Sequence, residues 1–506
     1  MNFSQKEKEQ INRQGLTESD VLQQIDCFVN GFDFLNLQRV ATINDGIQQY
    51  TKEETENFAR IYQDKIKDLS VVKFVPASGA ATRMMKDLYT FLEEYKDENT
   101  TPLHSFPKVE QVINEIEHFA FYTLLQQKMK QDGIDISKCL SEKNYKIIVE
   151  YILTEKGLNY GKSPKAWILF HKYKDKYITA FEEHLIETAN LGIENVEFSI
   201  LKEHKEGFQN LVETIVPQYE KLFKVKYNIT FSYQEHSTDT IAVDLQNNPV
   251  HDKNGDLIFR PSGHGALLTN INRLDSDIIF IKNIDNLSSL YRKETILYKQ
   301  FLGGILIDTK EKIANTLQKL QKPRLSKQEL VSISNTIKRQ LKLSHIRNFM
   351  EFPTLAYYKR YLIELLNRPV RVCGMVKNEG EPGGGPFFVK KDGEETLQIV
   401  EKAQVNLRNE NQNKIFLEST HFNPVDLVVS IKSYDGKKFR LSRFVDNQTG
   451  FISEKSFEGK TIKALEKPGL WNGSMSKWIT IFVEVPSQTF SPVKTINDLL
   501  KAPHQS

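Results

Sequence analysis

Residues 71–95 contain the residue types that bind phosphate groups. Between an apolar run and a helical pattern stand five small residues, which are Ala77, Ser78, Gly79, Ala80 and Ala81. Small side chains let backbone N–H groups approach phosphate oxygens, and the N-terminus of a helix adds a positive dipole. Arg83, which follows Thr82, can bind two phosphate oxygens through its guanidinium group. The stretch predicts a phosphate-binding loop, and the alternative is a tight turn whose small residues serve packing.

A lysine beside a proline could serve the same chemistry. Lys165 follows Pro164 at the start of an apolar segment. Near the C-terminus, Lys494 follows Pro492 and precedes an amphipathic stretch. A lysine held beside a phosphate loop would neutralise phosphate charge. The alternative for Lys165 is a solvated residue at the edge of a strand.

A histidine between two glycines is followed, further along the chain, by an aspartate at the end of an apolar run. Gly263, His264 and Gly265 predict a turn in which the backbone can approach a flat ligand closely. Asp285 follows the apolar run Ile278–Ile281, and the carboxyl end of a buried strand is where open α/β sheets place ligand chemistry. The alternatives are a hydrogen-bonded turn histidine and an aspartate that caps the next helix.

The elements that must position these residues are strands and helices in succession. Val71–Val75 predicts a strand buried on both faces, Thr82–Tyr95 and Ala180–Asn190 predict helices, and Ala166–Phe170 and Thr396–Val405 predict further strands. We therefore predict an α/β fold with a mixed, mostly parallel sheet flanked by helices. Residues 1–68 are expected to form a helical N-terminal layer. Residues 69–506 are expected to form the main domain, with helical insertions near 97–160 and 288–365.

Composition limits the possible functions. The 506 residues include 68 basic and 65 acidic ones, and a net charge of +3 gives no support to a nucleic-acid or membrane-surface role for the chain as a whole. Cys27, Cys139 and Cys373 have no paired spacing, which favours a reducing compartment over a disulfide framework or a zinc site. The polar N-terminus is unlike a signal peptide, and no apolar stretch is long enough to span a bilayer. We therefore expect a cytoplasmic protein.

Six stretches, in chain order, resemble motifs of the nucleotide-sugar pyrophosphorylases, the uridylyltransferases that join a nucleoside triphosphate to a sugar 1-phosphate. They are PASGAATRM (76–84), Pro164-Lys165, PSGHGALL (261–268), IIFIKNIDNL (278–287), VEKAQV (400–405) and FSPVKTINDLL (490–500). Alanines replace two of the small residues that the family has in its glycine-rich loop, and the Pro-Lys pair comes much later in this chain. The whole chain also resembles an uncharacterised bacterial family that is distantly related to these enzymes.

The resemblance implies a nucleotidyltransferase-like (Rossmann-like, glycosyltransferase A type) fold and a role for each matching residue. It implies that residues 77–82 and Arg83 hold the triphosphate, that Lys165 and Lys494 neutralise charge between the substrates, and that Asp285 holds Mg²⁺. Gln234 and residues 263–265 would bind the base. Residues implied for the sugar are Asn283, Glu401 and Asn423. A second metal carboxylate is not identified, although Asp426 and Asp446 are candidates.

These observations leave three functions open. The first is Mg²⁺-dependent transfer of a uridylyl group from UTP to a sugar 1-phosphate, with release of pyrophosphate. The second is a glycosyltransferase on the same fold that uses a nucleotide sugar as donor. The third is a non-catalytic protein that binds a nucleotide sugar, which the alanines in the loop and the missing second carboxylate favour. The sequence names neither the base, nor the sugar, nor the oligomeric state.

Overall fold

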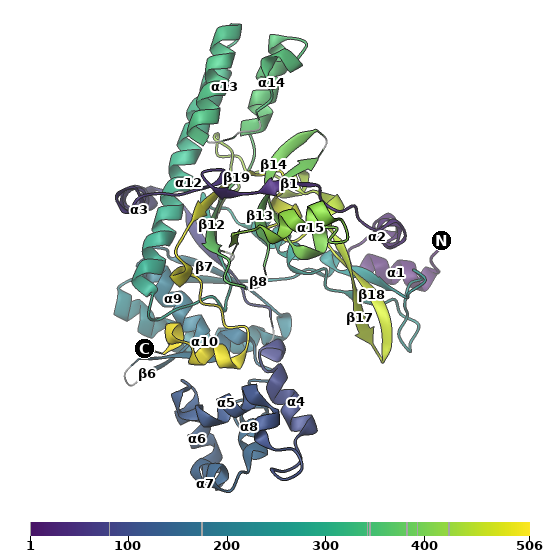
Figure 1. The fold of residues 1–506 in the computed structure, drawn as a ribbon, viewed down its shortest axis with the longest axis vertical. Helices are drawn as coiled ribbons and strands as arrows, with labels where there is room; N and C mark the ends of the chain where they lie inside the picture. Colours follow the sequence, from purple (N-terminus) through teal and green to yellow (C-terminus); the bar gives the residue numbers. More distant parts are fainter. Residues whose placement is uncertain are drawn as a thin grey trace. The chain divides into compact units, whose positions relative to one another are not determined.

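A computed structural model describes residues 2–79, 81–173, 176–341, 343, 346–380, 383–391, 393–423 and 426–505. The chain divides into two compact units (Figure 1). Unit 1 comprises residues 1–71, 233–280 and 300–485, and unit 2 comprises residues 72–232, 281–299 and 486–506. Elements that cross a boundary are assigned below to the unit that holds most of their residues.

Unit 1 contains a mixed sheet in the order β2-β3-β19-β12-β16-β11 and two smaller antiparallel sheets, β1-β13-β14 and β10-β9-β18-β17. The pairs β2–β3, β3–β19 and β19–β12 are parallel, whereas β16 and β15 pair with β12 in the antiparallel sense. The strands are β1 (Leu37–Val40), β2 (Thr42–Ile43), β3 (Gly46–Gln48), β9 (Thr240–Val243), β10 (Phe259–Arg260), β11 (Ile278–Lys282), β12 (Val370–Lys377), β13 (Gly385–Lys391), β14 (Glu394–Val400), β15 (His421–Phe422), β16 (Asp426–Ser430), β17 (Phe451–Phe457), β18 (Lys460–Glu466) and β19 (Ile479–Glu484).

The helices of unit 1 cover these sheets and extend beyond them. Tyr62 of α3 packs edge-on against Phe280 of β11, with ring centroids 5.7 Å apart. Helices α13 and α14 pack together and project from the rest of the unit (Figure 1). The helices are α1 (Gln5–Arg13), α2 (Glu18–Asn30), α3 (Lys52–Lys65), α11 (Leu267–Arg273), α12 (Arg292–Leu320), α13 (Lys327–Leu341), α14 (Leu355–Leu366) and α15 (Glu410–Leu417).

Unit 2 contains strands in the order β4-β7-β8, with β4 and β7 parallel, and the hairpin β5-β6. Phe181 of α9 and Phe208 of α10 pack against Phe198 of β7, so these helices cover the strands. The elements are β4 (Val71–Pro76), β5 (Leu169–Tyr173), β6 (Lys176–Thr179), β7 (Asn195–Ile200), β8 (Asn228–Tyr233), α4 (Lys86–Glu94), α5 (Pro107–Asn114), α6 (Tyr122–Gln131), α7 (Ile136–Ser141), α8 (Tyr145–Leu153), α9 (Ala180–Asn190) and α10 (Lys205–Phe223). The predicted α/β class with a mixed, mostly parallel sheet flanked by helices is confirmed.

Several predicted elements differ from the observed ones. Residues 1–68 are not helical throughout, because strands β1, β2 and β3 lie between α2 and α3. Helix α4 begins at Lys86 rather than Thr82, since residues 81–83 form a 3₁₀ turn whose Ala81 is buried. The strand expected at Ala166–Phe170 begins at Leu169 after another 3₁₀ turn. The strand expected at Thr396–Val405 ends at Val400, so that Glu401 follows it.

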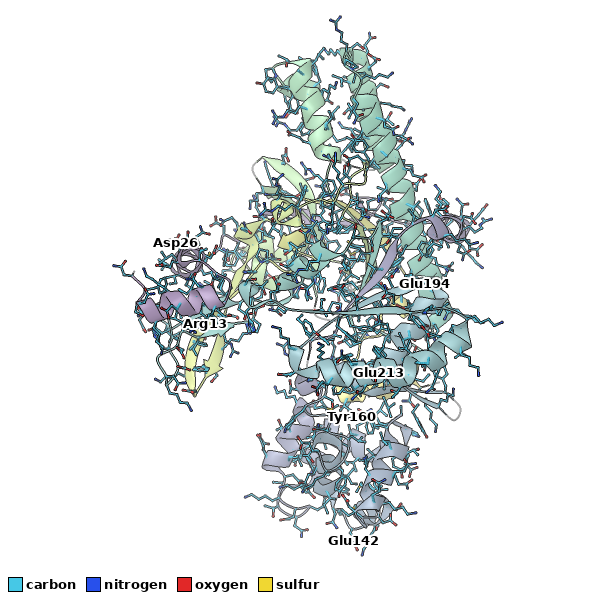
Figure 2. All side chains as sticks on the ribbon, turned by 180° about the vertical axis from the view of Figure 1, so that it is seen from behind. Arg13, Asp26, Glu142, Tyr160, Glu194 and Glu213 are labelled. Atoms are coloured by element: carbon cyan, nitrogen blue, oxygen red, sulfur yellow. The ribbon has the colours of Figure 1, made fainter. Side chains whose placement is uncertain are left out.

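The helices of residues 97–160 explain why the Pro-Lys pair comes so late in the chain. Figure 2 places Tyr160, where this segment ends, well away from Glu142 at its far end. The chain then returns to α4: Gly161 donates to the Leu153 carbonyl at 3.0 Å, and a Cβ on Gly161 would lie 2.1 Å from the Tyr89 hydroxyl. This helical segment of unit 2 therefore separates the small-residue loop from Pro164 and Lys165 in the sequence, while the chain after it returns to α4, which follows the loop.

None of the helices in the described part of the chain combines the length and apolar character needed to cross a membrane.

Candidate functional site

Asp285 lies between two lysines in unit 2. Lys165 Nζ is 2.7 Å and Lys494 Nζ is 3.0 Å from the same carboxylate oxygen, Oδ2. The side chains of Lys165 and Asp285 are 12% and 9% exposed, whereas that of Lys494 is 59% exposed. Burial raises the pKa of Asp285, but the ammonium groups of Lys165 and then Lys494 outweigh it, so the pKa lies below its usual value. The three residues therefore form a charged centre with a net positive charge.

Backbone pairing between two distant motifs creates this arrangement. Val493 N–H donates to the Asp285 carbonyl at 2.9 Å, and Ser491 N–H donates to the Asn286 side chain at 2.9 Å. Lys165 Nζ also donates to the Val493 carbonyl at 2.8 Å. The C-terminal Pro-Val-Lys segment thus lies against the Asn-x-Asp-Asn segment, and one lysine comes from each side of the pair.

The small-residue loop adjoins the same centre but offers fewer free amides than predicted. Ala77 N–H donates to the Ser199 carbonyl at 2.8 Å, and Ala81 N–H donates to the Ser163 carbonyl at 3.2 Å. The prediction that these two amides bind phosphate is therefore wrong, because both are used inside unit 2. The bond to Ser163 does place the loop two residues from Lys165 in the chain. Ala80 lies outside the described residues.

The middle of the loop remains open. Ser78 and Gly79 have no backbone hydrogen bond to other described residues, and Gly79 is exposed. Thr82 and Arg83 are also exposed, and within the described ranges Arg83 has neither a hydrogen bond nor an ion pair. The structure therefore brings Lys165, Asp285 and Lys494 into contact and leaves Arg83 outside that contact.

Gly79→Ala tests whether a ligand approaches this loop. A Cβ at Gly79 would meet no protein atom within 4 Å, so we expect an unchanged melting temperature. If phosphate binds here, the methyl group would displace it, and kcat/KM for the triphosphate is expected to fall about a hundredfold. The measurement is steady-state kinetics beside thermal unfolding. An unchanged kcat/KM would exclude a close approach at Gly79.

A network of buried side chains bonds the backbone of the segment that carries Asp285. His184 Nε2 donates to the Ile284 carbonyl at 3.2 Å, and Lys73 Nζ donates to the His184 carbonyl at 3.1 Å. Lys73 and Lys299 both pair with Glu187, at 2.7 and 3.2 Å. This network positions the backbone next to Asp285. Its residues lie outside the sequence motifs described above.

The C-terminal segment that carries Lys494 makes a second set of contacts with unit 2, at His504. His171 Nε2 contacts His504 Nδ1 at 2.9 Å, and His171 Nδ1 contacts Glu183 at 2.7 Å. Arg292 donates to both oxygens of Glu183, at 3.0 and 3.1 Å. Because His504 is buried in this network, the C-terminal segment has a second point of attachment in unit 2 besides Lys494.

The His171–His504 contact predicts instability in mild acid. Burial, and then Arg292, lowers the pKa of His171 to about 3; burial, and then His171, lowers the pKa of His504 to about 3. Imidazoles of the unfolded chain take up protons below about pH 6.5, whereas these two do not until the pH is far lower. As the pH drops from 6.5 to 5, each imidazole lowers the free energy of unfolding by about 1.4 kcal/mol per pH unit. Burial, and then Glu187, raises the pKa of Glu183 to about 8, so this carboxyl binds its proton only in the folded state and contributes the opposite change. The net expected fall for the three groups is therefore about 1.4 kcal/mol per pH unit.

Chemical denaturation of wild type and His504→Asn across this range checks the prediction. Asparagine can still donate to His171, but it does not titrate, so its slope with pH should be shallower. Equal slopes for the two proteins would contradict the assignment to this contact.

Unit 1 holds a second group of predicted residues around His264. The His264 ring stacks on Trp471, with centroids 4.6 Å apart and planes at 22°. Leu470 N–H donates to His264 Nδ1 at 3.0 Å, which leaves the ring proton on Nε2. Burial lowers the pKa of His264 to about 4, against the opposing effect of Glu466. The imidazole is therefore neutral at pH 7 and forms a flat aromatic pair with Trp471.

Close packing accounts for the glycines on either side of His264. A Cβ on Gly263 would lie 2.9 Å from a Glu466 carboxylate oxygen, and a Cβ on Gly265 would lie 2.1 Å from the Pro468 carbonyl oxygen. Gly263 also has a φ of +80°, which favours glycine. Both glycines are thus required by the protein itself, whether or not a ligand lies against the turn.

Glu401 and Asn423 lie near Gly384 in the same unit. A Cβ on Gly384 would be 3.5 Å from Glu401 Cγ and 3.6 Å from Asn472 Nδ2. Burial, and then Glu466, raises the pKa of Glu401, whose carboxylate is 3.9 Å from His264 Nε2. The polar N–H groups of Asn423 already have partners within the protein. Its backbone N–H donates to the Gly384 carbonyl, and its side-chain Nδ2 donates to the Gly374 carbonyl at 3.2 Å. Of these residues Glu401 is the one that remains near the His264–Trp471 pair with a partly exposed carboxylate.

The remaining predicted residues are placed separately. Gln234 follows β8 in unit 1, and its buried Nε2 has no hydrogen-bond partner among the described residues. Asn283 lies two residues before Asp285 in unit 2, whereas Glu401 and Asn423 belong to unit 1. Sequence reasoning gave no role to Trp471, Asn472 and His184. Their signals were weak, since a tryptophan after a Pro-Gly pair and a histidine on an apolar helix face are ordinary in protein cores.

The chemistry of Asp285 fits a magnesium ion to a limited extent. Its Oδ1 is buried and has no hydrogen-bond partner in the described part of the chain. Mg²⁺ keeps several waters and needs one or two carboxylates together with phosphate oxygens. The described residues contain no group of three or more His, Cys, Asp and Glu that could hold a metal alone. Asp426 and Asp446 lie in unit 1, and Asp446 is paired with Lys391 at 2.6 Å.

Comparison with solved structures shows a likeness to pyrophosphorylases of UDP-sugars. The uridine diphosphate N-acetylglucosamine pyrophosphorylase of Trypanosoma brucei aligns over 95% of this chain and 74% of its own, with 11% identity and a TM-score of 0.49. The UDP-glucose pyrophosphorylase of Leishmania major, solved with UDP-glucose, aligns over 97% and 77%, with 11% identity and a TM-score of 0.43. A UDP-glucose phosphorylase of Trypanosoma brucei aligns over 98% and 77%, with 12% identity and a TM-score of 0.44.

At such identities and TM-scores the likeness is one of fold and carries no argument about activity. None of the curated proteins matches the chain in sequence. Residues 4–505 match the family described as "Domain of unknown function (DUF4301)". Because that match extends over nearly the whole chain, the protein belongs to this family.

Proposed function

We propose that the protein is a Mg²⁺-dependent nucleotidyltransferase that transfers a uridylyl group from UTP to a sugar 1-phosphate. The observation that carries the proposal is the contact of two lysines from separate motifs with one oxygen of Asp285. A centre with net positive charge, beside an open small-residue loop, suits a reaction between two phosphate-bearing substrates.

The reaction needs no protein nucleophile. An oxygen of the sugar 1-phosphate attacks the α-phosphorus of the triphosphate, the bond from that phosphorus to the bridging oxygen breaks, and pyrophosphate leaves with the electron pair. Catalysis then depends on in-line positioning and on neutralisation of charge. Lys165 and Lys494 would neutralise the attacking and transferred phosphates. Arg83 and the amides of Ser78 and Gly79 would hold the outer phosphates.

A magnesium ion would be held by Asp285 Oδ1, and it would supply further charge neutralisation on the phosphates. The carboxylate is already neutralised by two ammonium groups, so its affinity for the ion is expected to depend on the phosphates of the substrate. We therefore expect weak Mg²⁺ binding to the free protein.

The residues of unit 1 would account for specificity. The neutral His264 and Trp471 would present aromatic rings to a base, and Gln234 has a buried donor without a hydrogen-bond partner among the described residues. Glu401 would accept hydrogen bonds from sugar hydroxyls, and Asn423 would support it through Gly384. Asn283 would bind the sugar, because it lies two residues before Asp285 in the chain.

A cytoplasmic location is part of the proposal. Cys27, Cys139 and Cys373 are all free thiols, which suits a reducing compartment.

The experiment is a thermal-shift and pyrophosphate-release screen with the four common nucleoside triphosphates, Mg²⁺ and a panel of sugar 1-phosphates. We expect UTP to raise the melting temperature and one sugar 1-phosphate to elicit pyrophosphate. Stabilisation by a nucleotide sugar without any pyrophosphate would replace the proposal with a glycosyltransferase or a binding protein. No response to any nucleotide would overturn it.

A further inference from the structure

The basic residues of the chain are unevenly distributed. Residues 316–368, which we call the helical arm, contain eleven lysines and arginines but three aspartates and glutamates. Since the whole chain has a net charge of +3, the rest of the chain is net acidic. The near-neutral total therefore conceals one strongly positive segment.

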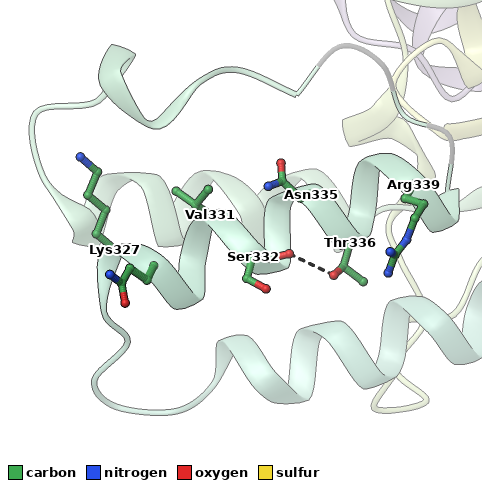
Figure 3. A pocket seen from close by; sticks show the side chains of 7 residues that line it. Lys327, Val331, Ser332, Asn335, Thr336 and Arg339 are labelled. Atoms are coloured by element: carbon green, nitrogen blue, oxygen red, sulfur yellow. Dashed lines mark hydrogen bonds between the residues drawn. The ribbon is translucent and has the colours of Figure 1, made fainter.

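The helical arm consists of the end of α12, α13 and α14. Its apolar side chains Leu330, Ile337 and Leu341 on α13 are buried. The rings of Phe352 and Tyr358 pack together within the arm, with centroids 5.1 Å apart and planes at 47°. The outer side of α13 carries polar and basic side chains, which Figure 3 shows along the helix. These side chains line an open hollow of about 700 Å³.

Most of the cations on this side have no acidic partner. Arg347 pairs with Glu351, four residues further along the chain, at 3.0 Å, and Arg360 pairs with Glu364 within α14 at 2.7 Å. By contrast, six exposed cations of α12, α13 and their connection form no ion pair within the described ranges. They are Lys319, Lys322, Arg324, Lys327, Lys338 and Arg339. Lys327 Nζ also lies over the Phe349 ring, 4.9 Å from its centroid, so an aromatic face rather than a carboxylate is its contact there.

The spacing and the neighbours of these cations suit a phosphate backbone. Lys327 and Arg339 line the same hollow on one broad face of α13 and are twelve residues apart, or about 18 Å along the helix. Between them this face carries Gln328, Ser332, Asn335 and Thr336. Lysine and arginine together with such neutral polar side chains are the groups that contact nucleic-acid phosphates.

Other partners fit less well. An amphipathic helix that binds a membrane buries an apolar face in the lipid, whereas the apolar side chains of α13 face the protein and the hollow contains one aliphatic residue, Val331. Protein interfaces are depleted of lysine and enriched in aromatic residues at their centre. We propose that the helical arm binds the phosphodiester backbone of a nucleic acid, independently of sequence and separately from the transferase site.

Fluorescence anisotropy with a labelled 20-nucleotide single-stranded RNA, and with a duplex DNA of equal length, tests this proposal. The full-length protein should bind with a Kd of about 10⁻⁶ to 10⁻⁴ M, and affinity should fall steeply between 50 and 200 mM salt. The triple variant Lys319→Gln, Lys327→Gln, Lys338→Gln should weaken binding about tenfold and reduce the salt dependence. The matched control is Lys128→Gln, Lys130→Gln, Lys221→Gln, three exposed helical lysines of unit 2.

Both triple variants should keep the melting temperature of wild type, because all six positions are exposed. A loss confined to the arm variant would support the proposal, and the stronger of the two probes would show whether RNA or DNA is preferred. No binding at 50 mM salt, or equal losses in both variants, would overturn it. So would arm-dependent binding to phosphatidylserine vesicles without binding to either nucleic acid.

Discussion

Asp285→Asn is expected to lower kcat/KM of the nucleotidyl transfer at least a hundredfold. The substitution keeps the size of the side chain but removes the negative charge that lies within 3.0 Å of both ammonium groups. Lys165 and Lys494 would then repel each other, and the carboxylate proposed to hold Mg²⁺ would become a neutral amide, which is a weaker ligand. Loss of one charged contact to a transition state costs about 2.7–4 kcal/mol, or 10² to 10³ in rate.

The matched control for this prediction is Asp87→Asn. Asp87 also lies in unit 2 and pairs with a lysine, Lys108. The side chains of Lys108 and Asp87 are 58% and 35% exposed, so this pair is open to solvent. Exposed pairs contribute about 0–1 kcal/mol, so Asp87→Asn should leave both activity and stability nearly unchanged. Steady-state kinetics and urea denaturation of both variants decide the matter, and equal activity in the two would remove Asp285 from the account.

Lys165→Met and Lys494→Met are expected to separate stability from catalysis. On the proposed function both remove a charge that would face the substrate phosphates, so each should reduce kcat about a hundredfold. Lys165 is largely buried and also bonds the Val493 carbonyl, whereas the Lys494 side chain is 59% exposed. Breaking a buried pair costs about 3 kcal/mol, while an exposed pair is worth about 1 kcal/mol or less.

We therefore expect Lys165→Met to lower the free energy of unfolding strongly and Lys494→Met to lower it little. The two variants are measured side by side by urea denaturation and by kinetics under saturating substrate. If Lys494→Met retained wild-type kcat, its contact with Asp285 would be structural only.

The local sequence pattern of apolar residues and helix caps was sufficient to predict some strands and helices. The apolar run at Val71 forms a strand from Val71 to Pro76, and the helix predicted at Ala180–Asn190 has those bounds, because Thr179 and Glu182 form a capping box. The union of Asp285, Lys165 and Lys494 could be suggested by motif order alone, although their contact depends on strand pairing between distant segments.

Other features depend on partners that pattern cannot show. The amides of Ala77 and Ala81 were expected to be free, but backbone carbonyls from β7 and from the Ser163 turn accept them. The glycines beside His264 are explained by the close approach of residues 466–468, which belong to another strand and its following loop. The charge of the helical arm is invisible in the net charge, since acidic residues elsewhere offset it.

The central claim is that one UTP and one sugar 1-phosphate give one nucleotide sugar and one pyrophosphate. The direct measurement is ³¹P NMR of the full-length protein with UTP, Mg²⁺ and the sugar 1-phosphate selected by the screen. We predict equimolar loss of UTP and sugar 1-phosphate, equimolar gain of pyrophosphate and of a nucleotide-sugar diphosphate, and none of this with Asp285→Asn. Release of inorganic phosphate, formation of free UDP, or an unchanged spectrum would contradict the account.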